Sequence, residues 1–173
     1  MHTPAESSRM ATDHTAPDKP LMDVTSVPWH ELKDSTGSAA AIPFLLAAIA
    51  SGDPAAAESG LDRLGQRICQ YDFVVGQATA AAVPFLWDLA EQPRVTCRTQ
   101  ILRLLRHIAD ARQWEITAAA YPRLRGRPDD YVEWENAARQ AVRAQRGAIP
   151  RLLTERDPEV VRATTELASA LTH

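Results

Sequence analysis

A short apolar motif built around a proline occurs three times in this chain, and this repetition limits the fold more than any other feature. The motif reads IPFLL at 42–46, VPFLW at 83–87 and IPRLL at 149–153. A step near 40 residues is typical of repeat proteins in which each unit is a pair of helices. The second step is longer, so extra residues lie between the second and third copies. The repetition therefore predicts stacked helix pairs.

Each copy also contains a proline that marks the corner between its two helices. The corners are Asp53-Pro54, Gln92-Pro93 and Asp157-Pro158. Proline is favourable in the first turn of a helix, where its missing N–H would have no partner. We expect Asp53 and Asp157 to cap the helices that follow. Pro43 and Pro84 each follow an alanine run, so the helix either starts at the proline or is kinked there, and we favour the kink.

The second helix of the middle copy, predicted at 94–109, has the clearest apolar stripe. At 100° per residue, one narrow arc collects Cys97, Ile101, Leu104, Leu105 and Ile108. Arg103, Arg106 and His107 point away from this arc, and Arg98 lies near its edge. On the preceding helix, Trp87 occupies the position of a leucine in the other copies, which favours a core role over ligand stacking.

The stretch DPEVVR at 157–162, followed by Leu167, Ala168 and Leu171, resembles the second helix of a HEAT repeat. The resemblance covers roughly 39–109 and 148–171. It implies an all-α fold: a short right-handed α-solenoid of HEAT-like, armadillo-type helical hairpins, used mostly to hold other macromolecules. It is a resemblance of fold and carries no catalytic residues.

These patterns predict a disordered tail at 1–26 and a single domain at 27–173. The copies fall at about 39–70, 79–109 and 148–172, with a helical insert at 110–147. The insert is either a diverged repeat or an element lying across the groove. Trp29, in a short helix before the first copy, is expected to cover the open apolar face of that copy.

Composition excludes several classes of protein. The sequence shows neither a secretory signal nor a run of about 18 apolar residues, so we expect a cytoplasmic protein without a membrane span. Two cysteines, Cys69 and Cys97, suit a reduced protein with buried thiols. The chain is rich in alanine, and only two of its 19 basic residues are lysines. Both features indicate a GC-rich bacterial genome. The lone pair His30-Glu31 cannot fill a metal coordination sphere, and no cofactor is expected.

The distribution of charge is uneven. The stretch 94–127 contains eight arginines against two carboxylates, whereas the whole chain has a net charge of −3. Such asymmetry indicates an acidic partner surface or a phosphate backbone. The alternative is a solvated surface, partly neutralised by Asp129, Asp130, Glu133 and Glu135. The candidate partner-binding residues are Arg98, Arg103, Arg106, His107, Arg123, Arg125, Arg127 and Arg162, with Glu58 as a further contact on the concave face.

The sequence contains no glycine-rich phosphate loop, nucleophile elbow or metal-spaced Cys/His set. We therefore favour a non-enzymatic module that holds an acidic partner protein, as an adaptor or as an inhibitor of the immunity type. The alternative is a nucleic-acid-binding enzyme resembling the HEAT-like alkylpurine DNA glycosylases, although the net negative charge argues against DNA. We expect a monomer or a weak dimer.

Overall fold

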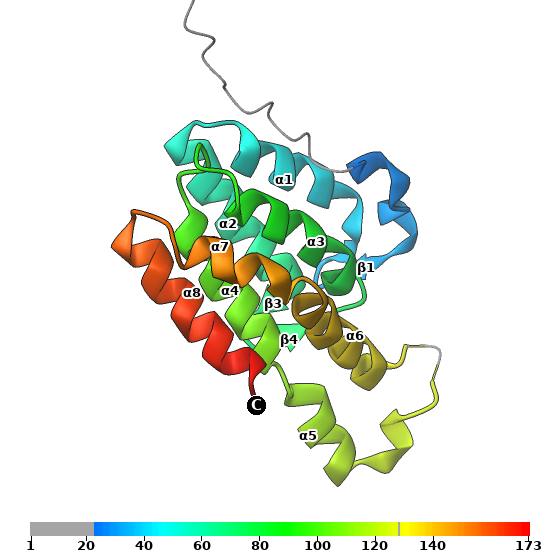
Figure 1. Ribbon diagram of the computed structural model, residues 1–173. Coiled ribbons are helices and arrows are strands. Elements are labelled where there is room, and N and C mark those ends of the chain that lie inside the picture. Colours follow the sequence, from blue (N-terminus) through cyan, green and yellow to red (C-terminus); the bar gives the residue numbers. More distant parts are fainter. Residues whose placement is uncertain (1–22, 128) are drawn as a thin grey trace, which may run out of the picture.

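The computed structural model describes residues 23–127 and 129–173, and helices account for most of this part (Figure 1). The α-helices are α1 (Ile42–Ala50), α2 (Pro54–Ile68), α3 (Thr79–Ala90), α4 (Arg98–Asp110), α5 (Gln113–Ala120), α6 (Tyr131–Ala144), α7 (Ile149–Leu152) and α8 (Pro158–Leu171). The 3-10 helices are η1 (Val24–Ser26), η2 (Trp29–Glu31), η3 (Ala39–Ala41), η4 (Pro122–Leu124) and η5 (Arg146–Ala148). The strands are β1 (Lys33–Asp34), β2 (Gly37–Ser38), β3 (Cys69–Gln70) and β4 (Val74–Val75). The predicted all-α class is confirmed.

Consecutive helices pack as pairs. α1 lies against α2, α3 against α4, and the short α7 against α8. Between neighbouring pairs, α1 contacts α3, α2 contacts α4, and α4 contacts α8 most extensively. Figure 1 shows α1 and α2 at one end of the molecule and α8 at the other. The buried residues, including Leu86 and Trp87, form one continuous core along these pairs.

The insert at 110–147 contributes α5 and α6, and the two behave differently. α6 packs against both α3 and α4 and continues through η5 into α7. It therefore belongs to the packed body and does not lie across a groove. α5 contacts α6 and η4, and it projects from the body together with the connection that follows it (Figure 1).

The prolines place helix starts largely as predicted. Pro54 and Pro158 lie in the first turns of α2 and α8, and the Asp157 carboxylate accepts a hydrogen bond from the Glu159 N–H at 2.9 Å. Asp53 makes no such side-chain cap. Pro43 lies in the first turn of α1 and does not kink it, because the preceding alanines form the separate turn η3, whereas Pro84 lies inside α3. The Gln92-Pro93 corner is followed by a turn, so α4 begins later than predicted, at Arg98.

Two small antiparallel hairpins were not predicted. β1 pairs with β2, and β3 pairs with β4. The segment 71–76 turns back on itself in the β3–β4 hairpin. Val75 is buried, but Phe73 is 46% exposed.

The N-terminal side of the described region covers the first-helix side of the stack. Trp29 is buried as predicted, and its ring packs on Phe85 with centroids 6.0 Å apart. The indole N–H of Trp29 donates to the carbonyl of Val24 at 2.8 Å. Residues 23–26 thus belong to the folded part, which corrects the predicted boundary of the tail at 26. The rest of that predicted tail, 1–22, lies outside the described residues.

One buried carboxylate holds α5 in place. The Glu135 side chain is fully buried, and its oxygens accept hydrogen bonds from the Trp114 and Glu115 N–H groups, both at 2.9 Å. These groups belong to the first turn of α5, where free N–H donors and the helix dipole favour an anion. Arg139, one turn along α6, balances the charge at 3.5 Å and also donates to the Ala111 carbonyl. Glu135 is therefore a cap from another helix, and it does not neutralise the arginine stretch.

We expect Glu135→Ala to lower the free energy of unfolding by about 3 kcal/mol, because it leaves Arg139 and two N–H groups without their buried partner. Chemical denaturation would measure the loss, and hydrogen exchange should show reduced protection in α5. The matched control is Glu133→Ala, an exposed glutamate on the same helix, which should cost less than about 1 kcal/mol. Equal effects of the two substitutions would contradict the capping role.

Candidate functional site

A well-formed hollow lies between α2 and α4. It has a volume of about 600 Å³ and opens to the surface. Its lining residues are Ser35, Thr36, Leu61, Asp62, Gly65, Gln66, Cys69, Gln70, Tyr71, Asp72, Gln100, Arg103, Leu104 and His107. We call it the α2–α4 pocket.

The pocket combines an apolar floor with a polar rim. Leu61 and Leu104 supply the floor from the buried stripes of α2 and α4, with Cys69 beside them. Because helix neighbours recur every three to four residues, the same helices also present polar side chains to the opening. Those side chains are Asp62 and Gln66 from α2 and Gln100, Arg103 and His107 from α4. An apolar floor with a few convergent polar groups is the usual form of a binding site.

The β1–β2 turn closes one side of the pocket, and buried polar contacts hold it there. The Asp34 carboxylate is fully buried and accepts a hydrogen bond from Arg67 of α2 at 2.8 Å. The same carboxylate accepts from the Thr36 N–H and hydroxyl, while the Ser35 hydroxyl donates to the Gln66 carbonyl at 2.6 Å. Ser35 and Thr36 therefore have fixed positions on the rim.

The β3–β4 turn closes another side with unusual backbone geometry. Tyr71 and Asp72 both have positive φ, at 55° and 66°. This region is uncommon for residues other than glycine, and such strain often marks a functional position. The turn presents the Tyr71 ring, 74% exposed, and brings an Asp72 carboxylate oxygen within 3.5 Å of His107 Nδ1.

Gly65 leaves part of the pocket unfilled. A glycine inside a helix costs about 1 kcal/mol relative to alanine. At Gly65, a Cβ would meet nothing within 4 Å, so packing within the described chain does not require glycine there. Gly60, one turn earlier, differs: its Cβ would lie 3.1 Å from Ala48 Cβ and 3.2 Å from the Leu45 carbonyl, so glycine allows α1 and α2 to approach closely.

The structure separates the predicted site residues into groups. Arg103 and His107 line the α2–α4 pocket. Arg106 and Arg162 are not among its lining residues, and they share one carboxylate of α8, Glu166, at 2.8 and 3.8 Å. Glu58 is exposed on α2, one turn before Asp62.

Arg98 is a correction to the predicted set. Its side chain is only 8% exposed. It donates to the Ala90 carbonyl and to the Glu155 carboxylate, both at 2.7 Å, and so ties α4 to the end of α3 and to the segment before α8. The hydrogen bond from Arg98 is the main reason that the pKa of Glu155 is lowered. Arg98 is buried because α8 covers the edge of the α4 stripe, which the sequence alone does not indicate.

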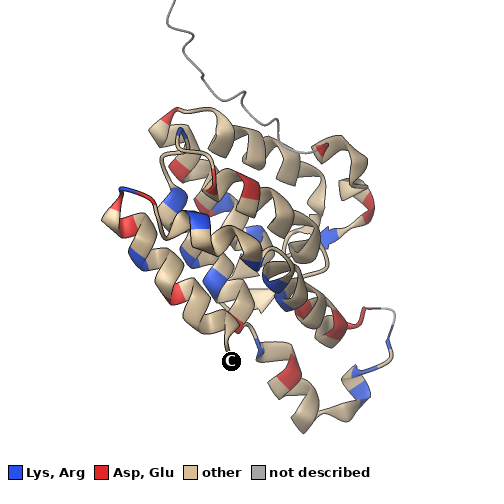
Figure 2. Ribbon diagram, viewed as in Figure 1, with Lys and Arg blue, Asp and Glu red and all other residues tan. Residues whose placement is uncertain are grey.

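The remaining predicted arginines, Arg123, Arg125 and Arg127, lie on the connection that follows α5. They are exposed and make no ion pair within 23–127 and 129–173. Figure 2 shows these basic segments on the part that projects from the body.

The basic stretch of the sequence is thus partly neutralised in the fold. Arg103 and Arg106 face Glu159 and Glu166 of α8, at 3.8 and 2.8 Å, and Arg112 faces Glu115 at 3.4 Å. Figure 2 shows acidic and basic segments interspersed over these helices. The acidic groups come mainly from α8 and not from 129–135 as predicted. Sequence reasoning did not identify Asp62, Asp72 and Tyr71 as site residues; the polar Tyr-Asp pair between apolar residues was the available signal.

The pocket holds few groups that could carry out chemistry. His107 and Asp72 form a loose pair that could hold a proton, but the nearby Ser35 hydroxyl is committed to the Gln66 carbonyl. Burial, and secondarily Asp72, raises the pKa of the Cys69 thiol to about 12, so this group is a poor nucleophile at neutral pH.

Over 23–127 and 129–173, no group of three or more His, Cys, Asp or Glu residues could hold a metal ion. Over the same ranges, no helix is long and apolar enough to cross a bilayer.

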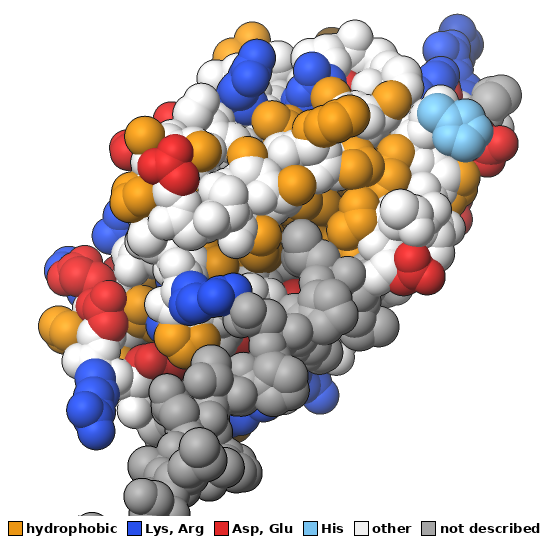
Figure 3. All heavy atoms as spheres, turned by 90° about the horizontal axis from the view of Figure 1, so that it is seen from above, with side chains coloured by type: hydrophobic (Ala, Val, Ile, Leu, Met, Phe, Trp, Pro, Cys, Tyr) orange, Lys and Arg blue, Asp and Glu red, His pale blue; other side chains and the backbone are white. Residues whose placement is uncertain are grey.

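A second hollow lies on the other side of the molecule. Val27, Pro84 and Phe85 contribute to its wall, and it lies between η1 and α3. Figure 3 shows apolar side chains gathered on this side, where Phe44 of α1 is 78% exposed. No predicted site residue lies there.

Comparison with known proteins identifies no relative: no family model, curated protein or solved structure matches this chain.

We expect Gly65→Ala to raise the free energy of unfolding by about 0.5–1 kcal/mol, because it improves helix propensity and meets open space. Gly60→Ala is the matched comparison on the same helix and should lower it, because the backbone carbonyl of Leu45 cannot move away from the new methyl group. Denaturant titration of both variants measures the difference. A loss of stability in Gly65→Ala would show that the pocket wall needs glycine for its own packing.

Charge reversal tests the link between α4 and α8. Arg106→Glu should lower the free energy of unfolding by about 1 kcal/mol, since it places like charges beside Glu166 and Asp110 at a half-exposed site. Adding Glu166→Arg should recover part of this loss, as a double-mutant cycle would measure. Arg156→Glu is the control, because this exposed arginine makes no ion pair in the described ranges. Identical effects of Arg106→Glu and Arg156→Glu would show that the pair contributes nothing.

Proposed function

We propose that this protein is a non-enzymatic binding module that holds a segment of another protein in the α2–α4 pocket. The observation that carries the proposal is the pocket itself: an open apolar floor, a fixed polar rim and an unfilled space over Gly65. The described lining brings no nucleophile to the His107–Asp72 pair, which supports binding over catalysis.

The proposal includes a short α-solenoid of HEAT-like hairpins as the architecture. Two observations support it: the proline motif recurs in α1, α3 and α7, and each of these helices packs against the helix that follows. In such a stack the second helices α2, α4 and α8 share one side, and a groove between them suits an extended segment of a partner. An adaptor or an inhibitor of the immunity type would use the groove in the same way.

The alternative, a nucleic-acid-binding enzyme resembling the alkylpurine DNA glycosylases, is less well supported. A phosphate backbone needs available cations. Arg98 is buried, and Arg103 and Arg106 already face carboxylates of α8. A partner protein with an acidic surface, as expected from the sequence, would have to bind the exposed arginines at 123–127.

The two free, buried thiols suit a reducing compartment, which supports a cytoplasmic location.

A photo-crosslinking experiment tests the binding function. A photoreactive phenylalanine replaces Gln100, which lines the pocket, and in a separate protein it replaces Glu133 on α6 as the control. In the cells that naturally express the chain, we expect one protein adduct from position 100 and none from position 133. Gly65→Trp, which fills the pocket, should abolish that adduct, whereas Gly65→Ala should preserve it. An adduct that forms equally from both positions, or that survives Gly65→Trp, would contradict binding in this pocket.

A further inference from the structure

We propose that the α2–α4 pocket selects a cationic side chain, arginine or lysine, from the partner segment. This inference rests on the proposed function and specifies its chemistry. It also differs from the expectation of an acidic partner, because it follows from the charges that remain available once the helices have packed.

The available carboxylates lie on the α2 side of the pocket. Glu58 and Asp62 are four residues apart on α2, both are exposed, and neither makes a hydrogen bond or ion pair with any described residue. Like charges at this spacing destabilise a helix by a few tenths of a kcal/mol. The folded chain therefore tolerates an unfavourable pair beside its pocket, and an external cation would relieve it.

A third carboxylate faces the pocket from the β3–β4 turn. Asp72 is 77% exposed in its side chain, and its ion-pair partner is His107, which carries charge only when protonated. The turn that presents Asp72 has positive φ at two successive residues. The strained backbone therefore places an acidic group at the opening.

The two arginines that α4 contributes to this surface face carboxylates of α8. Arg103 is the one guanidinium among the lining residues, and it extends toward Glu159 of α8 at 3.8 Å. Arg106 lies outside the lining and contacts Glu166 and Asp110. An incoming anion would have to compete with these carboxylates and would also meet Asp62 and Asp72. An incoming cation meets two carboxylates that lack a permanently charged partner.

The shape of the pocket fits a long cationic side chain. Arginine and lysine bury their aliphatic stems on apolar surface while the charged head stays near water. Leu61 and Leu104 supply such a surface, and the space over Gly65 leaves room for the stem. The exposed Tyr71 ring lies at the same rim, where a guanidinium can stack on it.

Capped tripeptides test the charge preference directly. The probes are Ala-Arg-Ala, Ala-Lys-Ala and Ala-Glu-Ala, each acetylated and amidated, and they are titrated at low salt into the full chain while backbone amide resonances are followed by NMR. We expect the arginine probe to shift the amides of Asp62, Gly65 and Asp72 with a Kd of about 1–10 mM, the affinity that a few exposed contacts allow. The lysine probe should shift the same amides, and the glutamate probe should not.

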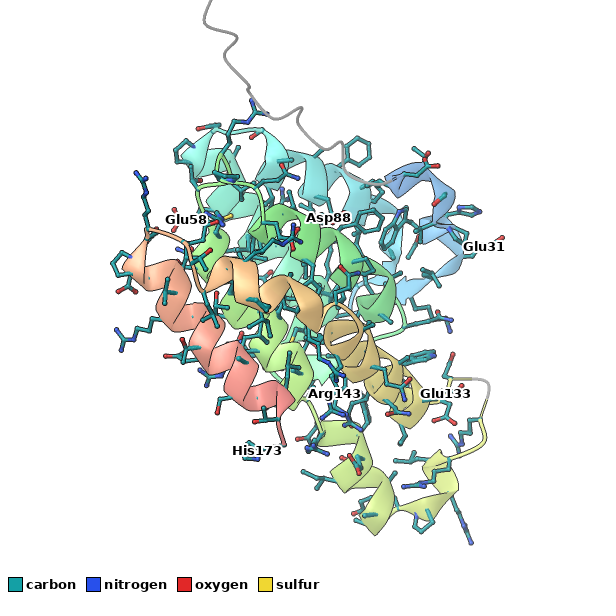
Figure 4. The ribbon with its side chains drawn as sticks, in the orientation of Figure 1. Glu31, Glu58, Asp88, Glu133, Arg143 and His173 are labelled. Atoms are coloured by element: carbon teal, nitrogen blue, oxygen red, sulfur yellow. The ribbon has the colours of Figure 1, made fainter. Side chains whose placement is uncertain are left out.

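Variants then identify the groups responsible. Asp62→Asn with Asp72→Asn should weaken the arginine probe by about fivefold, since each exposed ion pair is worth at most about 1 kcal/mol. Asparagine accepts positive φ, so the turn at Asp72 is preserved. The control is Glu133→Gln: Glu133 is an exposed acidic residue on α6, well apart from Glu58 in the view of Figure 4. This substitution should leave the titration unchanged.

The proposal is overturned if no probe shifts these amides, if the glutamate probe binds as well as the arginine probe, or if the double variant binds as tightly as the parent. The outcomes are separable from those of the crosslinking experiment. If a pocket-dependent adduct forms but the pocket shows no preference for cationic probes, the cation selectivity is contradicted and the binding function is supported. If the pocket binds the cationic probes selectively but gives no adduct, the proposal of a protein partner is contradicted and the cation-binding site is supported.

Discussion

The packing of α4 against α8 is the contact on which the remaining arrangement depends, because α4 also touches α2, α3 and α6. Its apolar stripe, including Ile101 and Leu105, is fully buried between these neighbours. Arg98 adds a polar link, since its guanidinium joins the Ala90 carbonyl of α3 to the Glu155 carboxylate before α8. A buried arginine is tolerated only when its donors are satisfied, so this link also fixes the relative positions of three segments.

The pocket is a consequence of the same packing. α4 lies close to α8 and only loosely against α2, so the surface between α2 and α4 stays open. The two hairpin turns then limit its length, one held by the buried Asp34 carboxylate and the other placed beside His107. With the α4 arginines directed to α8, the side facing α2 keeps its negative charge. The position of α8 therefore determines both the shape and the charge of a site to which it contributes no lining residue.

The elements that could be predicted from the sequence are those whose signal is local and periodic. The stripe of α4, the core position of Trp87 and the cap at Asp157 follow from helical spacing and from the chemistry of helix starts. The β-hairpins were missed because strands of two residues have no period to detect. The ion pairs of the arginine stretch could not be predicted for a different reason: Arg106 and Glu166 lie 60 residues apart in the chain, and only the tertiary structure brings them together. The Tyr71–Asp72 turn and the open space at Gly65 likewise depend on tertiary packing.

The way in which α5 is attached gives the molecule a part that can open separately. It packs mainly on α6 and η4, and the Trp114 ring stacks on Tyr131 at 4.3 Å. Its first turn is held by Glu135, and the Trp114 indole N–H donates to the Val75 carbonyl at 3.2 Å. A segment with so few connections belongs to the low end of the range of local opening free energies in a folded chain. The three exposed arginines beyond it would therefore exchange between attached and detached positions while the core of α3, α4 and α8 remains intact.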